Sequence, residues 1–250
     1  MEMIPVIKKN LSDSITHNLR DYINNMDLEK NSKLPPENVI SQNYGVSRVT
    51  VRRALDELEQ EGLIIRIHGR GTFVNTQATH LKINFGTSEE FSQMIEKSGY
   101  KTRIELVSFH QEKADIEKAD LLNIHQGKPL IVVEKNYFAD RNLAINNIDY
   151  IPVSLFENIP DIEEWRINSN YVIMRKHAGV LVARERIHVE SMSKKEVANY
   201  TGEANKYKCD SLLSLSGVLF DSSNSPVCYG LAFFDSQFLH FEMIRTQVAY

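Results

Sequence analysis

The chain has 250 residues and a mass of 28.7 kDa, which is more than one typical domain needs, so two domains of unequal size are expected. Hydrophobic residues make up 42% and charged residues 25% of the chain, a globular composition that excludes a disordered tail, a collagen-like repeat and a disulfide scaffold. No apolar stretch is long enough to span a bilayer, and the polar N-terminus lacks a secretion signal, so we expect a cytoplasmic protein with no membrane partner. Cys209 and Cys228 are the only cysteines, and we expect both to be free thiols.

The net charge of −4 conceals an uneven distribution of charge along the chain. Residues 1–75 carry ten basic and ten acidic side chains, so the whole net charge lies in the rest of the chain. Five arginines fall within 23 positions of the neutral part: Arg48, Arg52, Arg53, Arg66 and Arg70. They predict a basic patch rather than a basic domain.

Three helices are predicted in the first part of the chain. Apolar residues recur at helical spacing over residues 12–25, and Pro36 can begin a short second helix that runs to about residue 44. The pair Gly45-Val46 then forms a tight turn, and Ser47 can cap a third helix that ends at Gly62.

A small hairpin is predicted to follow the third helix. Residues 63–67 and 72–74 are short and rich in β-branched or aromatic side chains, and the turn His68-Gly69-Arg70-Gly71 separates them. The order of three helices and a hairpin is that of a winged helix-turn-helix, whose second motif helix enters the DNA major groove.

Several blocks of this region resemble the GntR family of bacterial transcription regulators. The blocks are Leu34-Pro35-Pro36-Glu37, the run from Gly45 to Leu55, Glu61-Gly62-Leu63-Ile64 and the run from Gly69 to Val74. The family usually has Ser where this chain has Pro36, a change that the first turn of a helix tolerates.

The resemblance implies a set of DNA-binding residues on the third helix and on the wing. Arginine can bind guanine edges or phosphates, and Arg48 and Arg52 are spaced to share one helix face. The alternative is that these arginines only pair with Asp56, Glu57 or Glu59 on a solvated helix. The implied contacts to double-stranded DNA are Ser47, Arg48, Thr50, Arg52 and Arg53 from the helix and His68, Gly69 and Arg70 from the wing tip.

The rest of the chain predicts an antiparallel α+β domain after a linker at residues 76–83. Thr87 and Glu90 can form a capping box for a helix that ends at Gly99. Strands are predicted at residues 104–109, 130–138, 143–150, 180–189, 212–220, 227–234 and 241–248. Helical segments are predicted at residues 114–122, 154–157, 170–177 and 194–200, and hairpin turns at residues 140–142 and 221–226.

This second part resembles the UTRA domain of the HutC subfamily, which has a chorismate-lyase-like fold and binds effectors. The resemblance rests on the run from Leu121 to Leu130, on Asp149-Tyr150-Ile151-Pro152 and on Ser225-Pro226-Val227-Cys228-Tyr229. The predicted organisation is therefore a winged helix-turn-helix domain at residues 1–75, a linker at 76–83 and an effector-binding and dimerisation domain at 84–250.

Two charged residues lie on otherwise apolar strand faces of the second domain. Alternation places Lys135 with Ile131 and Val133, and it places Glu185 with Ile187 and Val189. A buried charge needs a partner or a ligand, so both residues are candidates for an effector site. The alternative is a charge at a strand edge whose polar end reaches water.

The resemblance extends this candidate site. Subfamily members that bind phosphorylated amino sugars use two strand arginines, a Phe-Ser pair and a Ser-x-Tyr element. This chain keeps Phe91-Ser92 and the pair Ser169 and Tyr171, but Lys135, Tyr137 and Asn147 replace the two arginines and a glutamate. Tyr229 belongs to the third matching block. One cation remains, so we expect an effector that is anionic or derived from a sugar, and we expect no cofactor or metal.

We therefore expect a homodimeric regulator, a repressor, that binds a palindromic operator and is released by a small effector. An enzyme is not expected, since the chain has no G-x-S-x-G, H-E-x-x-H, Walker or dinucleotide motif. Two alternatives remain open. One is a chorismate-lyase-like enzyme fused to a DNA-binding domain, and the other is a structural DNA-binding protein without a ligand.

Overall fold

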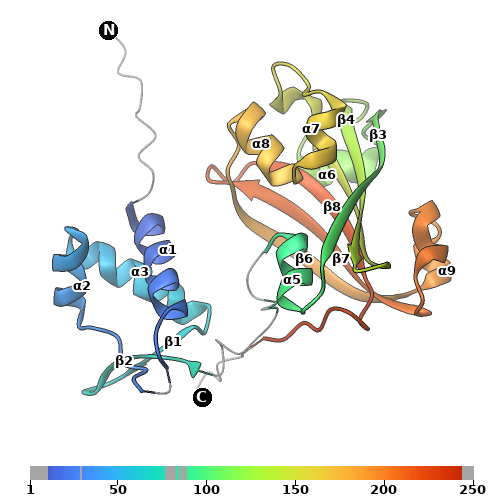
Figure 1. Ribbon diagram of the computed structural model, residues 1–250. Helices are drawn as coiled ribbons and strands as arrows, with labels where there is room; N and C mark the ends of the chain where they lie inside the picture. The colour runs from blue at the N-terminus through green and yellow to red at the C-terminus, as the bar shows by residue number, and fades with distance from the viewer. Residues whose placement is uncertain (1–10, 29, 77–82, 84, 86–88, 244–250) are drawn as a thin grey trace, which may run out of the picture. The chain divides into compact units, whose positions relative to one another are not determined.

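In the computed structural model, the described residues are 11–28, 30–76, 83, 85 and 89–243. The chain divides into two compact units, one from Met1–Thr87 together with Phe241–Tyr250 and the other from Ser88–His240. Figure 1 shows helices and a small hairpin in the first unit and a larger sheet with helices in the second. No helix in the described ranges is long and apolar enough to cross a membrane.

The first unit begins with three helices, as predicted. They are α1 (Leu11–Asn24), α2 (Glu37–Tyr44) and α3 (Arg48–Gln60). Gly45 ends α2 with φ of 64°, a left-handed conformation that glycine adopts without steric cost. The chain then turns through Val46 to Ser47, whose hydroxyl accepts a hydrogen bond from the Thr50 backbone N–H and caps α3.

The hairpin packs against these helices and completes one hydrophobic core. Its strands, β1 (Ile64–Ile67) and β2 (Gly71–Val74), pair antiparallel. Ile64 and Val74 are buried with apolar side chains from all three helices. Arg20 of α1 donates two hydrogen bonds to Glu61, at 2.7 and 3.0 Å, and so ties α1 to the end of α3. This unit has the predicted winged helix-turn-helix order.

The segments that precede and follow the second unit in the sequence come together in the first unit. The Phe85 N–H donates to the Glu242 carbonyl and the Glu242 N–H donates to the Ile83 carbonyl, at 2.8 and 3.1 Å. Ile83 is fully buried, although the sequence places it in the linker. Of the predicted strand at 241–248, the described residues hold only an isolated bridge at Glu242, and residues 244–250 lie outside the described part. Residues 241–243 belong to the first unit rather than to the domain predicted to run to residue 250.

The second unit is built on one six-stranded antiparallel sheet. Its strands, in spatial order, are β3 (Thr102–Lys113), β4 (Pro129–Ala139), β5 (Asn142–Pro152), β8 (Pro226–Phe234), β7 (Ser211–Asp221) and β6 (Val182–Ser193). Short turns at the two predicted places join β4 to β5 and β7 to β8. Strand β6 pairs with β7 and forms one edge of the sheet.

Helices cover both faces of this sheet. One face packs against α7 (Ile162–Ile167) and α8 (Asn170–Ala178), with Trp165 at the centre of the core, and against α5 (Phe91–Lys97). The opposite face packs against α6 (Ile116–Leu122), α9 (Lys194–Val197) and the 3₁₀ turn η2 (Gly202–Lys206). We call these the α8 face and the α6 face of the sheet.

Several local predictions differ from the structure. Helix α7 and turn η2 were not predicted, because neither has a long apolar period. Residues 153–155 form a 3₁₀ turn, η1 (Val153–Leu155), in place of the predicted helix at 154–157. Glu90 is the N-cap residue of α5 and its side chain makes no capping bond, so the predicted capping box is wrong at this residue, and Thr87 lies outside the described residues.

Candidate DNA-binding surface and effector site

Helix α3 turns its arginines to solvent because its apolar residues face the core. Val51, Ala54, Leu55 and Leu58 are buried, and the side chains of Arg48, Arg52 and Arg53 are exposed on the other side of the helix. The capping residue Ser47 is also exposed, and its hydroxyl lies 2.8 Å from that of Thr50. The structure therefore brings all five predicted helix residues to the first two turns of α3 or to its cap.

Glu37 of α2 orients one of these arginines. The Arg52 guanidinium donates to the two carboxylate oxygens of Glu37 at 2.9 and 3.4 Å, and this contact lowers the pKa of the Glu37 carboxyl. The pair is exposed, so it contributes little stability. Its consequence is geometric, because it restricts where the Arg52 side chain points.

The acidic residues of α3 bind other partners than the α3 arginines. Arg66 of β1 donates to Asp56 and, at 3.2 Å, to Glu59. The Glu57 carboxylate accepts a hydrogen bond from Thr16 at 2.8 Å. Within the described part of the chain, Arg48 and Arg53 form no ion pair. The alternative interpretation, in which α3 arginines pair with α3 acids, is therefore not what the structure shows.

The wing tip is an exposed turn whose conformation requires glycine. His68, Gly69 and Arg70 are all exposed. Gly69 has φ of 73° and a side chain there would meet no atom within 4 Å, so backbone conformation rather than space selects glycine. The guanidinium of Arg70 lies 6.0 Å from the centre of the Phe73 ring. The first unit therefore offers two exposed sets of cations and polar groups, on α3 and on the wing.

Lys135 lies in the core of the second unit and is fully buried. Its ammonium donates to the Asn168 carbonyl and to the Asn170 side-chain oxygen, both at 2.7 Å. Burial lowers the pKa of Lys135 to about 8, against the opposing effect of the charges of Asp149 and Glu90. The alternative of a strand-edge lysine that reaches water is excluded, and the ammonium already has partners from the chain.

Asp149 of β5 completes a polar network around Lys135. Its carboxylate accepts from Asn170 at 2.6 Å and from Asn147 at 3.2 Å, so Asn170 links it to Lys135. Burial raises the pKa of Asp149, although the hydrogen bonds from Asn170 and Asn147 and the charge of Lys135 oppose that effect. Asn147 is the cross-strand neighbour of Lys135 and also donates to the Leu231 carbonyl. These four residues are called the Lys135 cluster below.

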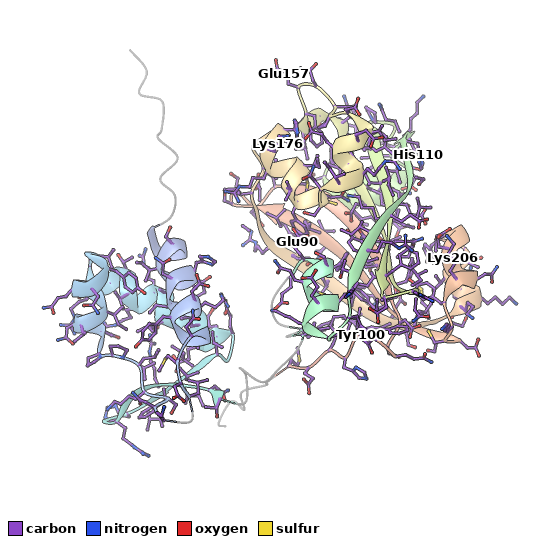
Figure 2. All side chains as sticks on the ribbon, viewed as in Figure 1. Glu90, Tyr100, His110, Glu157, Lys176 and Lys206 are labelled. Carbon is purple, nitrogen blue, oxygen red and sulfur yellow. The ribbon has the colours of Figure 1, made fainter. Side chains whose placement is uncertain are left out.

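The start of α8 and the start of α5 meet beside this cluster. Ser169 caps α8 and donates to the Glu90 carboxylate at 2.8 Å; Figure 2 labels Glu90 at the start of α5. Phe91 packs edge-to-face on Tyr137, with 5.2 Å between ring centres. Tyr137 is 5% exposed, and burial raises the pKa of its hydroxyl. The predicted residues Phe91, Tyr137 and Ser169 are therefore brought together with Lys135.

The other predicted effector residues have different positions. Tyr171 packs against the core of the α8 face, and Ser92 accepts a hydrogen bond from Thr102 through its backbone carbonyl. Glu185 is exposed on β6, over Gly217. Tyr229 lies on the α6 face, where it stacks on Tyr150 at 5.8 Å. The sheet separates Tyr229 from Lys135, so the structure does not place it in the predicted site.

Three residues of the site were not predicted from the sequence. Asp149, Asn170 and Glu90 provide most of the polar contacts around Lys135 and Ser169. Asp149 follows the same alternation rule as Lys135, since it lies between Asn147 and Ile151 on the α8 face, and that signal could have found it. Asn170 and Glu90 are helix-start residues whose role depends on tertiary packing.

An open hollow of about 470 Å³ lies elsewhere in the second unit, around α9. It is lined by Ser193, Lys194, Lys195, Ala198, Asn205 and Asp210. None of the predicted effector residues lines it. In the described ranges, no group of three or more His, Cys, Asp and Glu side chains has the arrangement of a metal site.

Comparison with known families and proteins agrees with this architecture. Residues 11–74 match the family described as "Bacterial regulatory proteins, gntR family", and residues 97–238, more than half of the chain, match the UTRA domain. The HTH-type transcriptional repressor NagR of Bacillus subtilis is 28% identical over 191 residues, which cover 75% of this chain and 76% of NagR. A protein of Escherichia coli K12 named "Probable fructoselysine utilization operon transcriptional repressor" is 24% identical over 201 residues, 78% of each chain.

Solved structures show the same fold. The possible transcriptional regulator YydK of Bacillus subtilis superposes with a TM-score of 0.67 at 16% identity, over 94% of this chain and 99% of YydK. PhnF of Mycobacterium smegmatis gives a TM-score of 0.56 at 19% identity, over 93% and 99% of the two chains. With an N-terminal unit of gntR type and a UTRA domain after it, the chain belongs to the GntR family of bacterial transcription regulators.

Proposed function

We propose that the chain is a homodimeric repressor that binds a palindromic DNA operator and is released by a small metabolite. The observation that carries this proposal is the exposed row of arginines on α3, of which only Arg52 has an ion-pair partner among the described residues, the Glu37 carboxylate. Arg48, Arg52 and Arg53 extend from the second helix of a helix-turn-helix, where side chains reach base edges and phosphates. As a repressor it acts in the cytoplasm, where the chromosome is.

Contacts from the wing add to those from α3. His68, Gly69 and Arg70 form an exposed turn beside the strand that carries Arg66, and Arg66 is bonded to α3. These hydrogen bonds link the wing to α3. A rigid pair of elements holds its contacts to adjacent grooves in a fixed register, which favours sequence-specific binding.

The proposed effector site is the Lys135 cluster with the adjoining starts of α5 and α8. It joins β4, β5, α5 and α8 through hydrogen bonds that are buried or partly buried, so a ligand that replaces these bonds would change how α8 packs on the sheet. A ligand acts as a switch when it binds one arrangement better than another. A sugar-derived effector is supported by the relative named for fructoselysine utilization.

Strand β6 supports a homodimer. It is twelve residues long, lies at the edge of the sheet and is exposed along most of its length. Antiparallel pairing with a second copy, about a two-fold axis at Ile187, places Arg184 opposite Glu190 at both ends. Opposite charges in cross-strand pairs are favourable, and pairing satisfies an edge that otherwise invites aggregation.

Charge reversal tests this interface. Arg184→Glu should weaken the dimer because like charges then face each other, and the double variant Arg184→Glu/Glu190→Arg should restore it. Sedimentation equilibrium of the three proteins measures both effects. A wild-type chain that sediments only at 28.7 kDa contradicts the homodimer, and a dimer that neither variant alters places the interface elsewhere.

Footprinting tests the repressor itself. DNA fragments from upstream of the chain's own gene and its neighbours are incubated with the protein and digested with DNase I. We expect protection of a two-fold symmetric sequence that overlaps a promoter. Uniform protection of every fragment, or none, contradicts specific repression.

A further inference from the structure

One apolar side chain of α3 does not face the core. Val51, Ala54, Leu55 and Leu58 are buried against the other helices and the hairpin, whereas Val49 is 64% exposed, more than any other large apolar side chain described in the first unit. The core therefore does not account for this valine. A single exposed apolar residue is common on protein surfaces, so its position on the helix decides whether it has a function.

Val49 lies in the first turn of α3, on the face that carries the arginines. Residues three and four positions apart on a helix are neighbours, so Val49 lies beside Arg52 and Arg53, and Arg48 directly precedes it in the chain. The side chains of all three arginines are exposed. The valine therefore presents an apolar group to solvent between positive charges.

Helix stability does not favour these residues in an exposed first turn. Unbranched residues and alanine have a higher helix propensity than valine, and an acidic side chain would complement the helix dipole. The first turn of α3 holds no acidic residue, and Arg48 places a positive charge at the positive end of the dipole. A surface that binds a negatively charged partner explains both choices.

The backbone around Val49 is fixed by the fold. The Ser47 hydroxyl caps the helix through the Thr50 N–H, and the side chain of Val51 is buried in the core. The direction of the Val49 side chain is thereby set, and a β-branched residue on a helix has one strongly preferred χ1 rotamer. The methyl groups of Val49 therefore meet a partner with little loss of conformational entropy.

The partner in the proposed function is the major groove of DNA, and the chemistry of that groove selects what a valine can contact. The N-terminal residues of the second helix of a helix-turn-helix reach base edges. Those edges present hydrogen-bond donors and acceptors and one apolar group, the C5 methyl of thymine. Burying a donor or acceptor against a valine would leave it unsatisfied and cost free energy. Thymine is therefore the base whose edge matches Val49.

We propose that Val49 is a specificity-determining residue that contacts the C5 methyl group of a thymine in each half-site of the operator. The inference rests on the proposed function and adds a defined base to the sequence that the chain recognises. Because Val49 lies beside Arg48 and Arg52 on the helix, this thymine lies close to the base edges or phosphates that those arginines bind.

Deoxyuridine substitution tests the contact. A duplex enriched by wild type from random DNA is resynthesised with deoxyuridine in place of one symmetric pair of thymines at a time, which removes the methyl groups and keeps the base pairing. Fluorescence anisotropy gives the Kd of each duplex for the full-length chain at one salt concentration. We expect one symmetric pair at which affinity falls about tenfold, because one buried methyl contact is lost in each of the two half-sites.

Val49→Ala shows whether the valine makes that contact. The variant should fold as wild type does, because the side chain is exposed and alanine favours a helix. Its affinities for the thymine and deoxyuridine duplexes should differ by less than about twofold. Arg70→Ala, on the wing, is the control, since it should weaken binding to both duplexes and keep the ratio between them.

The outcomes separate this inference from the proposed function. Loss of the ratio in Val49→Ala with retention in Arg70→Ala supports the contact. The contact is overturned if the ratio persists in Val49→Ala, if it is lost in both variants, or if no deoxyuridine pair weakens wild-type binding; in each case the repressor stands. If wild type enriches no sequence, the proposed function fails together with the contact.

Discussion

Arg52 and Lys135 are both cations close to a carboxylate, but their surroundings differ. Arg52 pairs with Glu37 on the surface of the first unit and keeps much of its side chain in solvent. Lys135 is buried in the second unit and is held by the oxygens of two asparagines. An exposed cation is ready for a large polyanion such as DNA, whereas a buried one is fixed by the fold. The position of a charge, more than its sign, decides what it can bind.

The largest effect is expected from a substitution in the buried hydrogen-bond network around Lys135. Asp149→Ala removes the acceptor of Asn170 and Asn147 and a carboxylate whose charge acts on Lys135, so we expect a loss of about 3 kcal/mol in the free energy of unfolding. Trp165 is the only tryptophan and is buried in the second unit, so its fluorescence during urea unfolding reports on this unit.

Glu185→Ala is the matched control for that change. Glu185 is exposed, and we expect its removal to change stability by less than about 0.5 kcal/mol. If the two variants lose the same free energy of unfolding, Asp149 is not part of a buried network. The contrast with the exposed pair of Arg52 and Glu37 would then not hold.

Arg52→Ala removes the exposed ion pair between Arg52 and Glu37. The fold should be intact because the pair with Glu37 is solvated, and affinity for the operator should fall by about 1–3 kcal/mol, five- to 150-fold. Fluorescence anisotropy with labelled operator measures it. Arg20→Ala is the control, since Arg20 pairs with Glu61 at the far end of α3 and should affect stability rather than DNA binding. Unchanged affinity in Arg52→Ala would remove this residue from the interface.

The lowered pKa of Lys135 predicts a dependence of stability on pH. Between about pH 8, where the folded lysine loses its proton, and its ordinary pKa above 10, the unfolded chain binds more protons, so raising the pH favours the folded state. Relative to Lys135→Met, wild type should gain about 1–2 kcal/mol from pH 7.5 to 9.5. Urea unfolding by Trp165 fluorescence at both pH values tests this. If the difference in the free energy of unfolding between wild type and Lys135→Met is the same at both pH values, the pKa of Lys135 is not lowered.

The smallest expected effect concerns the N-terminal cap of α3. Ser47→Ala removes the hydrogen bond to Thr50 and should destabilise the first unit by about 1 kcal/mol. Ser41→Ala, in α2, is a matched control because the Ser41 hydroxyl only bonds a carbonyl of its own helix. Thermal unfolding by circular dichroism compares them. Equal melting temperatures for both variants would contradict a role of Ser47 as a stabilising cap.

The two regions also differ in how far the sequence predicts them. The proposed DNA-binding surface depends on local signals: Gly45 ends α2, Ser47 caps α3, and spacing turns Arg48 and Arg52 to one face. Each signal lies within a few residues of the side chain it positions. The three helices and the hairpin were accordingly predicted to within a few residues.

The proposed effector site depends on contacts between distant segments. Alternation found Lys135, but its partners lie 33 and 35 positions away on another element, and no local pattern connects them. Tyr229 was assigned to the site by a motif, although its strand turns it to the opposite face. Strand register and helix packing decide such placements, and one sequence does not give them.

Selection of binding sites from random duplex DNA is the most direct test of the central claim that α3 and the wing make this chain a sequence-specific, dimeric DNA-binding protein. Full-length wild type and a variant with alanine at Arg48, Arg52 and Arg53 are each carried through the same rounds, and the stoichiometry on the enriched duplex is then determined by sedimentation. We predict that wild type enriches one two-fold symmetric sequence bound by two protomers, and that the variant enriches none. Enrichment of the same sequence by the variant, or binding of wild type to all duplexes alike, would contradict the account.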